Sequence, residues 1–141
     1  MTKSVLSLLF GCLLCVFAHA QYSNDIVIET LMKADTTSIG QKILYPQVEH
    51  AEVTVFKITM QPGTSTGWHK HDIPLFAYIL QGTLTVEREN GERKQFTAGT
   101  AISEMRDQYH QGLNEGEDPL VLIAFYLGGD NKPLAIRKPN P

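Results

Sequence analysis

Short runs of apolar and β-branched residues, separated by turn residues, make up most of the chain after residue 50. The runs are rich in Val, Ile, Thr, Phe and Tyr and show no long helical period, which favours β-strands. Strands that repeat at roughly ten-residue spacing are typical of an all-β sandwich or barrel. The predicted strands are 53–60, 76–80, 83–88, 93–96, 100–105 and 119–127.

Two local patterns add detail. Asn90-Gly91 accepts positive φ at both positions and therefore predicts a tight type I′ hairpin. Alternation along the strand near residue 78 predicts one face toward the barrel interior and one face outward. The inward set is Leu75, Ala77 and Ile79, and the outward set is Phe76, Tyr78 and Leu80.

The region before residue 50 is less regular. Residues 26–34 are compatible with a short helix or with an edge strand, and residues 36–40 have the composition of a loop. We therefore expect an N-terminal strand or loop segment ahead of the barrel.

Residues 1–20 read as a leader. Lys3 precedes an apolar run at 5–18, and Ala18-His19-Ala20 places small residues where a signal peptidase cuts. We predict a signal peptide cleaved after Ala20, which gives a secreted or periplasmic protein. A membrane anchor is the alternative, but the fourteen residues of the run span only about 21 Å of helix, against a hydrocarbon core of roughly 30 Å.

The cysteine content and the distribution of charge exclude several classes of function. Both cysteines, Cys12 and Cys15, lie in the leader, so the mature chain has no disulfide and no thiolate nucleophile. Removal of the leader changes the formal net charge from −3 to −4, because Lys3 is its one charged residue. Charges are scattered without a basic run, so we expect no nucleic-acid partner and no membrane contact of the mature form.

The histidines carry the candidate chemistry. His69 and His71 are two residues apart, which on a strand places both imidazoles on one face, with Cα atoms about 6.6 Å apart. Two imidazoles placed in this way can bind one metal ion. The pair alone is a weak signal, because partly exposed histidines also occur at this spacing.

The surrounding spacing makes the signal stronger. Gly63 is followed by five residues and then His69-Lys70-His71, with Gly82 eleven residues later; His110 comes eleven residues after Gly99, and Asn114 four residues after His110. These spacings resemble the two motifs of the cupin superfamily, over about residues 53–127. The resemblance implies a single-domain, RmlC-like double-stranded β-helix, a jelly-roll-like barrel. It also implies that His69, His71 and His110 are metal ligands.

The chain departs from the family pattern at one important place. Leu75 and Phe76 occupy the positions of the usual glutamate ligand, and Thr97 replaces the proline of the second motif. Three interpretations stay open. Three histidines hold the metal alone, a carboxylate from elsewhere completes the site, or the protein binds no metal. Glu104 is the candidate for that carboxylate and also for a general base.

The resemblance also bears on function and organisation. We expect one divalent ion (Fe, Zn, Mn, Ni or Cu) and a small chelating or anionic ligand, with Lewis-acid or oxygenase-type chemistry. The alternative is a non-catalytic binding module of the cell envelope. Cupins often dimerise through sheet faces, and the outward set fits a homodimer, although a second sheet or the N-terminal segment would cover it equally well. The predicted divisions are 1–20, 21–50, a cupin barrel at 51–129 and a C-terminal tail at 130–141.

Overall fold

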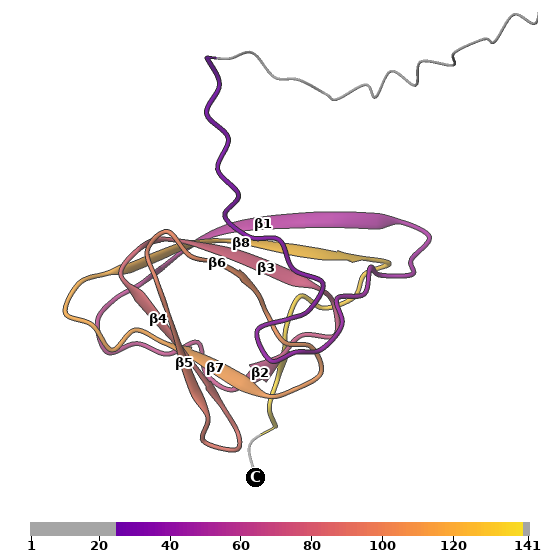
Figure 1. The fold of residues 1–141 in the computed structure, drawn as a ribbon. Helices are drawn as coiled ribbons and strands as arrows, with labels where there is room; N and C mark the ends of the chain where they lie inside the picture. Colours follow the sequence, from indigo (N-terminus) through magenta and orange to yellow (C-terminus); the bar gives the residue numbers. More distant parts are fainter. Residues whose placement is uncertain (1–24, 140–141) are drawn as a thin grey trace, which may run out of the picture.

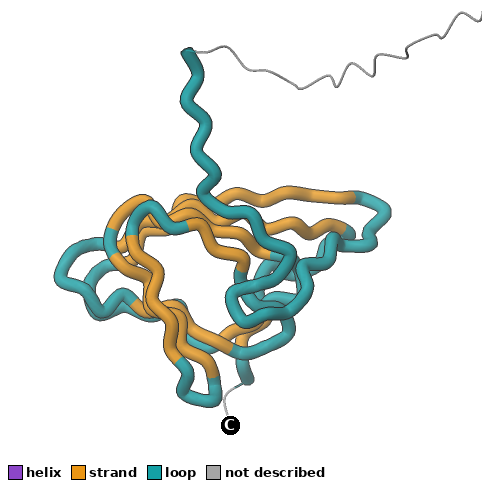
Figure 2. The backbone as a smooth tube through the Cα atoms, viewed as in Figure 1, coloured by secondary structure: helices purple, strands orange, loops and turns teal. Residues whose placement is uncertain are grey.

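The computed structural model describes residues 25–139, which form two antiparallel β-sheets that face each other (Figure 1). Those residues contain strands and loops but no helix, as Figure 2 shows, and so no helix that could cross a membrane. The all-β barrel prediction is confirmed. The leader and its cleavage site lie outside the described residues.

One sheet has four strands and the other has five. The four-stranded sheet runs in the order β1 (Ala51–Met60), β8 (Leu120–Gly129), β3 (Leu75–Gln81) and β6 (Ala101–Ser103). The five-stranded sheet runs in the order β5 (Arg93–Thr97), β4 (Thr83–Arg88), β7 (His110–Leu113), β2 (His69–Lys70) and β9 (Ile136–Arg137).

Strand β3 shows how the sequence pattern builds the core. Leu75, Ala77 and Ile79 are at most 4% exposed, whereas the residues between them face outward, as predicted. Ile79 packs in one buried cluster with Leu120 of β8 and Leu84 of β4, so this core joins the two sheets. Burying a side chain of this size contributes about 1.5–3 kcal/mol to folding.

The hairpin between β4 and β5 differs from the prediction. Gly91 has a φ of 82°, but Asn90 is not among the described residues with positive φ, so a type I′ turn is wrong. The Gly91 amide donates to the Arg88 carbonyl, and the Arg88 amide donates to the carbonyl of Glu92. The loop therefore has three residues, with a type I turn followed by glycine in the left-handed region. Sequence alone did not distinguish the two because Asn-Gly suits both.

Over its described residues, the N-terminal segment is a loop and not a helix or a strand. Residues 26–34 form neither a helix nor a strand, and their side chains are exposed, Val27 by 95%. Figure 1 shows the start of the described chain extending away from the barrel. The segment lacks the buried partner surface that its apolar residues would need to fix a regular element.

Residues 36–42 form a loop, as expected for 36–40, and it is fastened to the barrel. The Ser38 amide donates to the Ser103 carbonyl at the end of β6, and Lys94 Nζ of β5 donates to the Ser38 carbonyl. The Gln41 side chain donates to the Arg106 carbonyl and accepts from the Arg106 amide. The loop thus spans the two sheets where the edge strands β5 and β6 face each other.

The chain after β8 returns to the five-stranded sheet. Where we expected a tail, Ile136 and Arg137 form β9 and pair with β2. This pairing gives the two-residue strand β2 a neighbour on each side, β7 and β9, and it brings the segment around Leu134 beside the histidines.

Candidate metal centre

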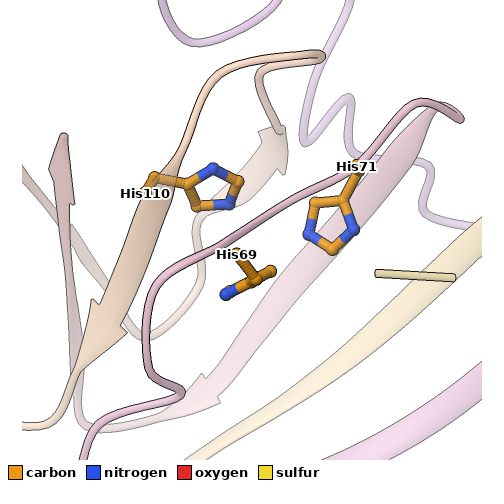
Figure 3. Close-up of side chains that lie close together, drawn as sticks. All are labelled: His69, His71 and His110. Carbon is orange, nitrogen blue, oxygen red and sulfur yellow. The ribbon is translucent and has the colours of Figure 1, made fainter. Parts of the chain in front are cut away.

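The three predicted ligands come together inside the barrel. His69 in β2 is the direct cross-strand partner of His110 in β7, and His71 follows immediately after β2. The ring centroids are 4.7–5.3 Å apart, and the candidate ligand nitrogens all lie within 4.8 Å of one another. Figure 3 shows the three rings converging from these two neighbouring segments.

Backbone carbonyls fix the orientation of each ring. The Nδ1 atoms of His69, His71 and His110 lie 2.8, 2.6 and 2.9 Å from the carbonyl oxygens of Gly67, Leu134 and Gln108. Because a carbonyl oxygen can only accept, each Nδ1 carries the proton. Each Nε2 is then left with a lone pair, which is the state in which an imidazole binds a metal.

The Glu104 carboxylate lies next to two of the three rings. Its Oε2 lies 3.2 Å from His110 Nε2 and 3.4 Å from His71 Nε2, and the side chain is 12% exposed. The Glu104 amide donates to the Leu75 carbonyl, so this glutamate lies beside the strand position where the family glutamate is missing. The structure thus brings a carboxylate from the segment after β6 to the place that β3 leaves apolar.

These donors fit a divalent cation. Two ligand atoms each about 2.1 Å from one tetrahedral ion lie about 3.4 Å apart, close to the separations between Glu104 Oε2 and the two Nε2 atoms. Two acceptors that face each other inside a protein also need a proton or a cation between them.

In the metal-free state, a proton lies between the Glu104 carboxylate and the imidazole that faces it. Burial by itself raises the pKa of Glu104, but the hydrogen bonds to His110 and His71 outweigh burial and hold the pKa well below its ordinary value. Burial alone would lower the pKa of His110, yet the hydrogen bond to Glu104 raises it on balance. The pKa of His69 is lowered, first by burial and then by the neighbouring imidazoles. Metal binding would therefore displace a proton shared by Glu104 and His110.

The space around the imidazoles is small and mostly apolar. The cavity has a volume of about 50 Å³, which is room for one or two water-sized groups. Leu75 and Leu84 line it, and so does Tyr126 of β8. The Tyr126 ring lies 5.7 Å from the His71 ring. Burial and the charge of Glu104 raise the pKa of Tyr126 to about 12, so its hydroxyl stays protonated.

Some of these residues had a sequence signal and others had none. Tyr126 shares the inward parity of Leu122 and Ala124 on the predicted last strand, so alternation would have found it. The three carbonyls could not be found, because any residue supplies one. Two other polar residues lie outside this group: Asn114 donates to the carbonyls of Met60 and Asp118 at a turn, and the side chain of His50 is 86% exposed.

A double-stranded β-helix with histidines from two neighbouring segments defines the cupin class. The cupin domain family model matches residues 56–126, and the chain belongs to this family. Among curated proteins, none matches the chain.

Solved structures agree on the fold. A cupin domain from Bordetella pertussis Tohama I is 23% identical, with a TM-score of 0.50 over 70% of this chain and 99% of its own. A Klebsiella pneumoniae protein with a double-stranded β-helix domain is 20% identical, with a TM-score of 0.50 over 64% of this chain and 78% of its own. The DMSP lyase DddQ from Ruegeria pomeroyi is 14% identical, with a TM-score of 0.52 over 60% of this chain and 42% of its own.

Proposed function

We propose that this cupin holds one divalent metal ion on His69, His71 and His110, with Glu104 as the fourth protein ligand. The observation that carries the proposal is the arrangement of donors. Three rings have Nδ1 fixed on carbonyls, and Glu104 Oε2 lies within 3.4 Å of two of the Nε2 atoms. Of the interpretations open from the sequence, the one in which a carboxylate from elsewhere completes the site therefore has the most support.

The charge of this set limits what binds next. Three neutral imidazoles and one carboxylate leave a single positive charge on a divalent ion, which favours a monoanionic or neutral chelating ligand. Imidazole with carboxylate suits Zn, Fe, Mn, Ni or Cu. When bound, such an ion supplies Lewis acidity, or dioxygen activation if it is iron or copper.

We further propose that the protein is an enzyme acting on a small molecule at this site. The Glu104 carboxylate has a second oxygen that can accept a proton from a ligand, which is the general-base role. Protonated Tyr126 can donate a hydrogen bond to a developing negative charge, and the apolar lining excludes bulk water.

Elemental analysis tests the metal proposal. Protein purified from metal-replete medium is expected to contain about one divalent ion per chain, and His69→Ala is expected to lose it. His50→Ala is the matched control, because His50 is exposed and lies outside the site. A wild-type protein without metal, or equal metal in wild type and His69→Ala, would contradict the proposal.

One observation favours the alternative of a non-catalytic binding module. The 50 Å³ cavity admits only small groups beside the ion. Activity assays with small chelators under air and under nitrogen distinguish the two. If the protein binds metal stoichiometrically and a chelator stabilises it, but no chelator is converted, the protein is a binding module and the enzyme proposal is wrong.

We also propose export and self-association. Mass spectrometry of the protein recovered from its native host is expected to show a chain that begins at Gln21.

A second copy is proposed to cover the outer face of the four-stranded sheet, where Val53, Val55, Leu80 and Phe125 are 39–62% exposed. Exposed apolar surface on one sheet face is a common mark of an interface.

A further inference from the structure

A second and larger pocket lies on the inner face of the five-stranded sheet. Its volume is about 390 Å³, within the range of small-molecule sites, whereas the metal cavity has only about 50 Å³. We call it the β4–β5 pocket, and its lining includes Val86, Arg88, Glu92, Lys94, Phe96 and Met105.

Strand register shows that this pocket adjoins the metal centre. Arg88 is the direct cross-strand partner of His110, and Val86 is the partner of Gly112. Opposed residues share one face of a sheet, so Arg88 and Val86 face the barrel interior together with the metal ligand. Met105 of the pocket also follows Glu104 of the metal centre directly in the chain. The two spaces are therefore neighbours within one barrel.

The pocket has apolar walls, one carboxylate, Glu92, that is paired with Arg88, and the ammonium group of Lys94. Val86, Phe96, Met105 and Ile39 supply apolar surface, and the first three are buried. Lys94 Nζ lies 5.4 Å from the Phe96 ring centroid and donates to the Ser38 carbonyl. Within residues 25–139, no carboxylate pairs with Lys94, so its ammonium group keeps donors for a ligand.

Arg88 also lines the pocket, but its charge is already paired with Glu92. Its Nη2 donates to Gln108, and its Nε, which has no hydrogen-bond partner among the described residues, is buried and out of reach of a ligand in the pocket. The other arginine in the lining, Arg93, is already paired with Glu115.

From this geometry we infer that the β4–β5 pocket binds a small organic anion with an apolar body, such as an aryl or short alkyl carboxylate. The carboxylate binds Lys94, and the apolar body packs on Phe96, Val86 and Met105. That such an anion is also the substrate rests on the proposed function; binding in the pocket does not.

Calorimetric titration with benzoate and hexanoate tests the inference, with benzamide and hexanamide as neutral controls. At least one acid is expected to bind saturably and about tenfold more tightly than its amide, because a charge-assisted hydrogen bond is lost in the amide. Lys94→Met is expected to weaken binding of the acid by about the same factor. The control Lys132→Met changes an exposed lysine outside the pocket and is expected to bind as wild type does.

Two further arms separate this inference from the metal proposal. Ile39→Trp is expected to block acid binding by filling the pocket from the loop side, without change to either cation. Titrations run in EDTA and with one equivalent of Zn²⁺ are both expected to show binding that depends on Lys94. If neither acid outbinds its amide, or if binding is lost in EDTA and in His69→Ala but kept in Lys94→Met, the pocket inference is wrong, whatever the metal content.

Discussion

The two sheets of this barrel contribute different numbers of residues to the candidate metal centre. The five-stranded sheet carries His69 and His110 on strands of two and four residues, and His71 just beyond one of them. The four-stranded sheet contains the ten-residue strands β1 and β8, which pair along their whole length. It contributes apolar wall, with Tyr126, and no histidine to the group. The three histidines therefore lie on the less regular layer, where hydrogen bonds to individual carbonyls hold them in place.

The sharpest test of this division removes a ligand from the five-stranded sheet. His110→Ala is expected to lower metal affinity by more than a hundredfold, since even partners that only orient ligands are worth 10–100-fold. Its thermal midpoint should no longer rise when Zn²⁺ is added, whereas the midpoint of wild type should rise. An equal response of both proteins to Zn²⁺ would show that His110 is not a ligand.

The next test weakens the apolar core of the four-stranded sheet and leaves the three histidines unchanged. Ile79 of β3 is fully buried, and Ile79→Ala is expected to cost about 2–5 kcal/mol of unfolding free energy, because the core loses contacts and gains a cavity. Urea denaturation of the metal-free protein measures this change. Metal stoichiometry at saturating Zn²⁺ should stay near one; its loss would mean that the two sheets do not act separately.

Glu104→Gln tests the one metal-centre carboxylate, which comes from the segment after β6. The lowered pKa of Glu104 gives metal-free protein a stabilising contribution that is present above about pH 4.5 and lost as pH falls through the folded pKa. The raised pKa of His110 gives one that is present below about pH 6.5 and lost as pH rises through the folded pKa. Both contributions are present together between these values.

Wild type should therefore exceed Glu104→Gln by about 1–3 kcal/mol in that window when both are metal-free, with a smaller difference at higher and lower pH. Unfolding curves at a series of pH values provide the measurement. Glu117→Gln changes an exposed glutamate and should show no such window. A difference that does not vary with pH would argue against the shared proton.

The smallest effect on stability is expected at the outer face of the four-stranded sheet. Leu80 is 48% exposed, and Leu80→Glu should change unfolding free energy of the monomer by no more than about 0.5 kcal/mol. Light scattering should nevertheless show a smaller particle than wild type, because a charge now lies on the proposed interface. A wild-type protein that is already monomeric would remove the self-association proposal.

Sequence predicted the features that depend on pattern. Alternation placed Leu75, Ala77 and Ile79 inside the barrel, and spacing selected the three histidines that the structure brings together. Glu104 could be selected because it lies between Gly99 and His110, on a segment expected to adjoin the histidines. Asn90 shows the limit of a local signal. The Asn90-Gly91 dipeptide suits both a type I′ turn and a type I turn followed by a left-handed glycine, and the pairing of β4 with β5 determines which one forms.

Features that depend on distant chain segments were out of reach. Residues 26–34 carry apolar side chains but make no strand, because nothing in the described fold offers them a buried surface. The β4–β5 pocket requires Ser38, Lys94 and Met105 to meet, and no sequence spacing relates them. The three orienting carbonyls belong to backbone, which carries no residue-type signal.

The carbonyl of Leu134 extends the site past the boundary that the family shares. The family match ends at residue 126, yet the atom that sets the direction of His71 lies eight residues later, in a segment anchored by β9. A protein cut after β8 would keep every side chain of the candidate metal centre and still lose the acceptor that orients the His71 ring.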